Sequence, residues 1–262
     1  MLKFYTLFFC LLLVACSNVS ITGRKQLIIL GDKTIYPQAF KAYQDFKDKN
    51  KLIETGKDIS NIEEVTENIK KAIKKYYRSI NKPDPTSNFS WEVILVDSKD
   101  IKNAWCMPGG KLAIYSGILE IAANQDALAA LMGHEIAHAV ARHGSERASQ
   151  EVLLELGTIA IENLLIDKPL SGDNRRLYQY FTNFGVMLPF SRTHEREADY
   201  LGLVFMHLAG YKMEEAYRMW QEMEKTVKKR TPEFLSTHPS SKRRITNIKK
   251  WIPEVREKYN NY

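Results

Sequence analysis

Apolar residues recur along the chain with two periods, one typical of helices and one typical of strands. A spacing of three to four residues, the period of an amphipathic helix, dominates. The segments with this spacing are Tyr36–Lys51, Asn61–Ile80, Gln125–Arg147 and most of the chain after Ser191, with a break at Thr231–Ser241. Short alternating or continuous apolar runs predict strands or docked arms at Thr22–Leu30, Phe89–Asp97 and Lys111–Tyr115. The pattern therefore predicts an α+β fold, mainly helical, with a small β-sheet.

Two later stretches fit neither period cleanly. Glu151–Ile166 is apolar but carries Glu155 and Glu162, so we interpret it as a partly buried helix and not as a membrane span. Leu170–Pro189 holds glycine, Asp-Asn and aromatic residues without periodicity. We interpret it as a loop or a lid over a cleft.

The first fifteen residues are almost wholly apolar after Lys3. Such a run is too short to span a bilayer comfortably and suits the central region of a secretory signal. It ends in Leu13-Val14-Ala15-Cys16, which resembles the bacterial lipobox. We therefore predict a signal peptide at 1–15, lipidation of Cys16, a tether at 16–35 and one domain at 36–262. A plain signal peptide or a buried strand is the alternative.

Composition and charge exclude few classes of function. The formal net charge is +7, but the lysines are scattered over the predicted helices and no nucleic-acid-binding module is recognisable. We therefore predict no nucleic-acid partner. Cys10 lies in the predicted signal and Cys16 is the predicted lipidation site, so Cys106 has no disulfide partner and is interpreted as a buried strand residue.

The strongest chemical signal is the motif His134-Glu135-Ile136-Ala137-His138. On a helix, residues four apart share one face, so both imidazoles can reach one metal ion. Glu135 lies beside them and can take a proton from the attacking water. The alternative is a surface helix with two unrelated histidines, but the apolar neighbours predict a buried helix, in which such groups need partners.

A catalytic zinc ion of this type usually takes three protein ligands. The stretch "SRTHEREADY", Ser191–Tyr200, offers the third. Ser191 can cap a helix, and Glu195 and Asp199 are four residues apart on one face of it. We predict that Glu195 completes a His-His-Glu site and that Asp199 accepts a hydrogen bond from the outer N–H of His134.

Other polar residues near the two motifs are rivals for these roles. His194 could replace Glu195 as the ligand, but the residue four positions on is Ala198, which cannot support it. His143 is five residues past His138, which would turn it to the far side of a continuous helix, so we interpret it as a capping or surface histidine. Glu197 points to another face and is predicted to be solvated.

These pieces together resemble the HtpX-like and CAAX-prenyl-protease-like family of zinc endopeptidases, especially its periplasmic lipoprotein members of the BepA and LoiP type. The resemblance is carried by Thr22–Leu27, Asn103–Leu119, Gly133–Arg147, Ser191–Asp199, Ala209–Tyr211 and Ser236–Ile245, which occur in the family's order. It implies a gluzincin-type core that binds one zinc ion per chain through His134, His138 and Glu195. It also implies that Glu135 is the catalytic base.

The resemblance implies a function as well. We expect an endopeptidase anchored to the bacterial outer membrane by its N-terminal lipid, facing the periplasm and cleaving misfolded or unassembled envelope proteins. Two alternatives stay open: a zinc-stabilised module that holds outer-membrane proteins without cutting them, and a zinc amidase that acts on peptidoglycan. The presence of a base at Glu135 argues against the first.

Two further predictions concern the surroundings of the metal. The strand Lys111–Tyr115 could receive an extended substrate by edge pairing. His238, in "STHPSSKRRI", reads as a surface histidine from the residues alone, whereas related chains carry a His-Pro near the zinc. The resemblance therefore implies that His238 either plugs the open metal position or stabilises the oxyanion, and that Arg244 orients the substrate or the loop.

Overall fold

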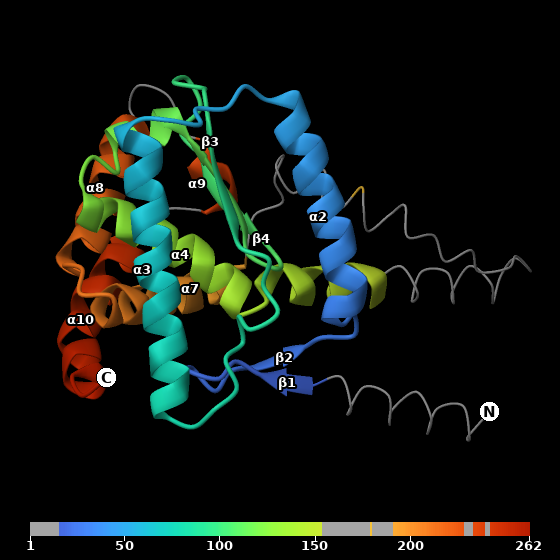
Figure 1. Ribbon diagram of the computed structural model, residues 1–262. Helices are drawn as coiled ribbons and strands as arrows, with labels where there is room; N and C mark the ends of the chain where they lie inside the picture. Colours follow the sequence, from blue (N-terminus) through green and yellow to red (C-terminus); the bar gives the residue numbers. More distant parts are fainter. Residues whose placement is uncertain (1–15, 154–178, 180–190, 228–232, 239–241) are drawn as a thin grey trace, which may run out of the picture.

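The computed structural model describes residues 16–153, 179, 191–227, 233–238 and 242–262 (Figure 1). The predicted signal at 1–15 lies outside the described residues. So do most of the predicted helix Glu151–Ile166 and all of the predicted loop or lid Leu170–Pro189 except Gln179.

Helices make up most of the described chain, which confirms the predicted fold class. They include α2 (Asp32–Lys49), α3 (Lys57–Ser79), α4 (Gln125–Val140), α7 (Arg192–Leu208), α8 (Glu214–Val227), α9 (Phe234–Thr237) and α10 (Lys242–Tyr259), with a 3-10 helix η1 (Ser116–Glu120). Among the residues that the structure describes, no helix is both long and apolar enough to cross a membrane.

The main sheet has three strands in the order β3-β5-β4. Strand β5 (Lys111–Tyr115) runs parallel to β3 (Glu92–Val96) and antiparallel to β4 (Ala104–Met107), so that Ala113 faces both Ile94 and Trp105. Because β5 is paired on both sides, the prediction that Lys111–Tyr115 offers an edge to a substrate is wrong. The reason is the tight connection between β4 and β5, which adds β4 as an outer strand that the periodicity analysis did not separate.

The sheet is sandwiched between helices (Figure 1). Successive strand residues point to opposite faces. On one face Trp105 and Ala113 pack with Ile35, Ala39 and Tyr43 of α2. On the other face the sheet packs into a larger cluster that includes residues of α3, α4 and α7. Cys106, the predicted buried strand residue, lies in β4 and belongs to this second cluster.

Helices α4 and α7 cross where each carries a glycine. A Cβ atom on Gly202 would lie 3.1 Å from the backbone nitrogen of His134, and one on Gly133 would lie 3.3 Å from the carbonyl oxygen of Gly202. Both contacts are tighter than side chains ordinarily make, so the missing Cβ atoms allow the two backbones to approach closely. The crossing lies beside His134 and so brings the two predicted metal-binding motifs together.

The N-terminal end of the described chain forms a separate antiparallel strand pair. Strand β1 (Cys16–Asn18) pairs with β2 (Lys25–Leu27), and Cys16 lies opposite Leu27. The predicted strand at Thr22–Leu30 is therefore shorter than expected and has a partner that the sequence did not indicate. We refer to residues 16–27 as the N-terminal strand pair.

Candidate metal centre

The histidines of the first motif lie on α4, which is buried almost along its whole length. Its first turn is capped by Asn124, whose side chain accepts a hydrogen bond from the N–H of Ala127. His134 and His138 are one turn apart on the same face, and their Nε2 atoms are 3.2 Å apart. Each ring is only 2% exposed. The spacing thus places two ring nitrogens at one buried point, as expected.

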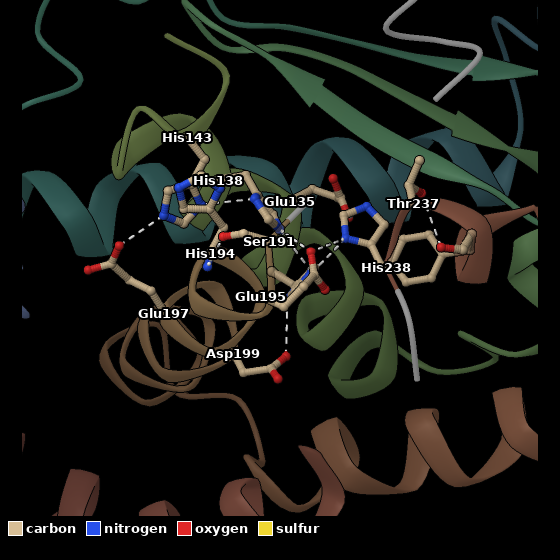
Figure 2. Close-up of polar contacts among 12 residues, drawn as sticks. Glu135, His138, His143, Ser191, His194, Glu195, Glu197, Asp199, Thr237 and His238 are labelled. Carbon is tan, nitrogen blue, oxygen red and sulfur yellow. Dashed lines mark hydrogen bonds and ion pairs between the residues drawn. The ribbon is translucent and has the colours of Figure 1, made fainter. Parts of the chain in front are cut away.

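The first turns of α7 bring one carboxylate to this point and a second to the outer nitrogen of His134 (Figure 2). Ser191 caps the helix by accepting a hydrogen bond from the N–H of His194, as predicted. One turn on, Glu195 has Oε1 3.4 Å from His138 Nε2 and Oε2 3.6 Å from His134 Nε2. Asp199 lies one turn further, with Oδ1 3.2 Å from His134 Nδ1. The structure therefore places both carboxylates where they were expected.

His238 reaches the same point from the end of α9. Its Nδ1 is 2.9 Å from Glu195 Oε1 and 3.2 Å from His134 Nε2. The ring stacks on Phe234, whose N–H donates to the carbonyl of Lys102 beside the sheet. His238 is 2% exposed, so it is not the surface histidine that the residues alone suggested.

The four groups fit a tetrahedral divalent cation. One ligand atom from each of His134, His138, Glu195 and His238 lies within 4.8 Å of all the others. Four ligands at about 2.0–2.1 Å from a zinc ion would lie about 3.3–3.4 Å apart, close to the distances above. Three ring nitrogens, from His134, His138 and His238, face one another. One proton cannot form hydrogen bonds to all three, whereas one cation can accept a lone pair from each. The arrangement and its nitrogen and oxygen donors suit zinc.

Glu135 lies next to this cluster and is almost fully buried. Its Oε1 has no hydrogen-bond partner among the residues that the structure describes, and it lies 3.5 Å from His238 Nε2. Burial raises the pKa of Glu135 above its ordinary value, and the nearby histidines oppose this shift only in part. A buried carboxylate with a raised pKa can accept a proton and hold it, which is the property that a general base in a hydrolase needs.

Arg244, from α10, binds the two carboxylates of α7 from behind. It donates to both oxygens of Asp199, at 2.8 and 2.6 Å, and its Nη1 lies 2.7 Å from Glu195 Oε2. The guanidinium also stacks 3.6 Å from the centre of the Trp220 ring. Burial alone would raise the pKa of Asp199, but the charge of Arg244 keeps this pKa below its ordinary value.

His143 and Glu197 lie in places that the sequence analysis did not predict. Both are buried, and His143 Nδ1 lies 2.9 Å from His138 Nδ1 while its Nε2 lies 2.9 Å from Glu197 Oε2. The helix assumed to run through Arg147 ends at Val140, and Arg142 adopts a positive φ of 60°. The chain therefore turns before His143 and directs its ring back to His138, so the prediction of a capping or surface histidine is wrong.

Three further residues that the sequence analysis did not assign to the site complete this buried cluster. His194 Nε2 lies 3.0 Å from Glu146 Oε2, and the His194 ring stacks on His143, so Glu195 and not His194 joins the four-residue group. Arg24 of the N-terminal strand pair bonds to Glu146, with Nη2 2.7 Å from Oε2. All three residues lie within motifs that carry the family resemblance, Arg24 in "TGRKQL", but those motifs alone do not indicate that the three side chains meet.

The family assignment follows from comparison with known proteins. The model of peptidase family M48 matches residues 63–252, which include every residue of the four-residue group. The chain belongs to peptidase family M48. Membership of M48 confirms the predicted enzyme class, a metallopeptidase, and is consistent with the gluzincin-type core.

The relatives of the chain include mitochondrial and bacterial proteins. A mitochondrial metalloendopeptidase OMA1 of Schizosaccharomyces pombe is 38% identical over 66% of this chain and 50% of its own length. The human mitochondrial metalloendopeptidase OMA1 is 30% identical over 90% of this chain and 45% of its own length. The β-barrel assembly-enhancing protease of Escherichia coli is 23% identical over 62% of this chain and 34% of its own length. The chain thus spans half or less of the length of these relatives.

These M48 relatives correct one prediction. The expected location in the bacterial outer membrane is contradicted, because the relatives of higher identity are mitochondrial proteins and the bacterial one is more distant. The expectation came from a short apolar run followed by a cysteine, a pattern with few constraints. The resemblance to periplasmic lipoproteins is likewise confirmed only at the level of the family.

Proposed function

We propose that this chain is a zinc-dependent endopeptidase in which His134, His138 and Glu195 hold the metal. The observation that supports this most is the convergence of their ligand atoms at 3.2–3.6 Å from one another, with Glu135 adjoining on α4. When bound, zinc supplies Lewis acidity toward water and the scissile carbonyl. Asp199 and Arg244 orient His134 and Glu195 through the contacts described above.

In this proposal Glu135 carries out both proton transfers. As the water oxygen attacks the carbonyl carbon, Glu135 accepts the proton that the water loses. It then passes that proton to the amine nitrogen as the C–N bond breaks. Burial favours the protonated form of Glu135, so the proton is held between the two steps. The carboxylate ends the cycle as it began it, ready for another peptide bond.

Strand β4 replaces β5 as the edge that we propose for the substrate. The N–H of Tyr115 donates to the carbonyl of Asn103, and alternate residues of an antiparallel pair face the partner strand. The N–H and C=O of Cys106 therefore turn to the outer side, where no described residue forms a strand. Helix α4 packs against β4, so an extended peptide paired there would lie near Glu135.

For His238 we propose the role of a plug. Its Nδ1 lies among the ligand atoms, at the place that a three-ligand site leaves for water or substrate. With His238 in this place, the site has four protein ligands and no position for a reactant. Turnover then requires the ring to move away, and α9 is only one helical turn long.

The substitution Glu135→Gln tests the proposal, because it removes the base and leaves the ligands. We expect the variant to bind zinc and to lose casein cleavage by about 10²-fold or more. Glu120→Gln, an exposed glutamate on η1, is the control for the amide substitution. Glu195→Ala should instead lose the zinc itself. Casein cleavage by Glu135→Gln at the control's rate would refute the proposed base.

A further inference from the structure

A second buried cluster of titratable side chains lies behind the proposed metal centre, on the side of His138 away from the metal ligands. It contains His143, Glu146, His194 and Glu197, and Arg24 joins it from the N-terminal strand pair. The two histidine rings are stacked, at 4.4 Å and 20°, so their nitrogens do not converge on one point. The cluster therefore lacks the geometry of a second metal site and needs another explanation.

The hydrogen-bond directions in this cluster follow from the metal ligand. His138 Nε2 faces the other ligand atoms and must be bare to bind a metal ion, so its proton lies on Nδ1. That N–H points at His143 Nδ1, 2.9 Å away, which must then accept. The proton of His143 therefore lies on Nε2 and is donated to Glu197 Oε2, also at 2.9 Å. Figure 2 shows Glu197, His143 and His138 in this order.

Glu197 is in turn held by the N-terminal strand pair. Thr22 Oγ1 donates to its Oε1, and Arg24 Nε donates to its Oε2 at 2.5 Å. Glu197 comes from α7 and His143 from the segment after α4, so the chain of contacts joins three separate parts of the fold. Each donor meets an acceptor: the directions of the two histidine bonds follow from the bare Nε2 of His138, and Glu197 accepts from Thr22 and Arg24 as a carboxylate.

We propose that His143 and Glu197 are positioning residues for His138, and that Arg24 extends this chain to the N-terminal strand pair. The proposal rests on the proposed metal centre and adds a support that its ligand set does not include. An acceptor on the outer nitrogen of a ligating histidine fixes the tautomer and the ring orientation, and it increases the basicity of the ligand. The N-terminal strand pair is thereby a structural part of the metal centre.

The affinity of the chain for Co²⁺ tests this directly. Glu197→Leu and Glu146→Leu are matched, since each removes a buried glutamate that pairs with Arg24, but only Glu197 contacts His143. We expect the Kd for Co²⁺, measured against a competing chelator, to rise about 10–100-fold in Glu197→Leu and in His143→Leu. Glu146→Leu should stay within about threefold of the unsubstituted chain. His143→Gln, which keeps one acceptor and one donor, should restore part of the affinity.

The proposal would be overturned if Glu197→Leu and Glu146→Leu weakened Co²⁺ binding equally, or if the Kd for Co²⁺ were unchanged in His143→Leu. The variant Glu195→Ala, measured in parallel, distinguishes failure of the positioning proposal from failure of the proposed metal centre. If the unsubstituted chain binds no Co²⁺, or Glu195→Ala binds it as tightly, the ligand assignment itself is wrong. If Glu195→Ala loses Co²⁺ and Glu197→Leu does not, only the positioning chain is wrong.

The proposal can also be tested on the unsubstituted chain, by NMR of its histidine nitrogens, if a variant does not fold. In the zinc-loaded protein with ¹⁵N-labelled histidine, we expect His138 to carry its proton on Nδ1 and His143 to carry its proton on Nε2. A slowly exchanging His138 Nδ1–H is the spectroscopic sign of the bond to His143. Finding the His143 proton on Nδ1 would contradict the proposed direction of the chain.

Discussion

Arg244 provides a sharp test of how the carboxylates of the site are held. The substitution Arg244→Met removes the guanidinium but keeps an apolar side chain against Trp220. Helix α10 also contains a matched control, Arg256. Each arginine places Nη2 2.6 Å from a carboxylate oxygen, on Asp199 for Arg244 and on Glu214 for Arg256. The Arg244 and Asp199 side chains are 8% and 3% exposed, whereas those of Arg256 and Glu214 are 54% and 33% exposed.

The expected magnitude follows from this difference in burial. At an effective dielectric constant of 20, two unit charges about 4 Å apart attract by about 4 kcal/mol. Arg244 faces two carboxylates, and the cost of taking its charge out of water offsets part of that attraction. Removing one partner of a buried pair leaves an uncompensated charge, which typically costs about 3–5 kcal/mol. An exposed pair contributes about 0–1 kcal/mol. We therefore expect Arg244→Met to lose several kcal/mol of stability and Arg256→Met almost none.

Urea unfolding of the metal-free chain is the suitable assay. A bound cation would neutralise Glu195 and hide part of the effect, so both variants should be measured with a chelator present and again with zinc. We expect the gap between the two variants to narrow when zinc is added. If the two free energies of unfolding agree within about 1 kcal/mol without metal, burial does not determine the strength of these pairs.

Two further predictions concern His238 and Glu146. If His238 is a plug, His238→Ala should raise basal casein cleavage at equal zinc content; a lower rate would assign it to oxyanion stabilisation, and an unchanged rate would refute both roles. Burial alone would raise the pKa of Glu146, but His194 and Arg24 lower it from 4.5 to about 2. The stability that Glu146 adds is therefore present above pH 4.5 and is lost as the pH falls toward 2. Urea titrations should show the difference between the unsubstituted chain and Glu146→Gln shrinking over that range; a difference independent of pH would contradict the assignment.

The candidate ligands could be predicted because their geometry is local. His134 and His138 are four residues apart on one helix, as are Glu195 and Asp199 on another, so a single helical repeat places each pair. The meeting of the two helices could be inferred only from chemical need, since buried imidazoles require partners. The structure supplies the physical reason in the close crossing of α4 and α7.

The supports of the site could not be predicted in the same way. His143 was misplaced because one residue, Arg142, adopts a left-handed conformation and ends the helical repeat on which the argument depended. Glu197 was expected in solvent because Arg24, the residue that covers it, is 173 positions away in the chain. The strand around Cys106 was expected but was given no bounds, because β4 is an apolar run of only four residues. Periodicity describes one element at a time and does not describe contacts between distant elements.

The glycine contact between α4 and α7 also bears on which ions the centre admits. The two proposed histidine ligands come from one helix and the proposed glutamate ligand from the other, so the spacing between the backbones sets the span that an ion would bridge. A Cβ atom on Gly202 would lie 3.1 Å, and one on Gly133 would lie 3.3 Å, from backbone atoms of the other helix, so a larger residue at either position would push the two helices apart. At the present spacing the ligand atoms lie 3.2–3.6 Å from one another, which suits zinc bonds of about 2.0–2.1 Å better than calcium bonds of about 2.3–2.6 Å. Two residues that have no side chain and lie outside the proposed ligand set thus help to set the size of ion that the proposed centre accepts.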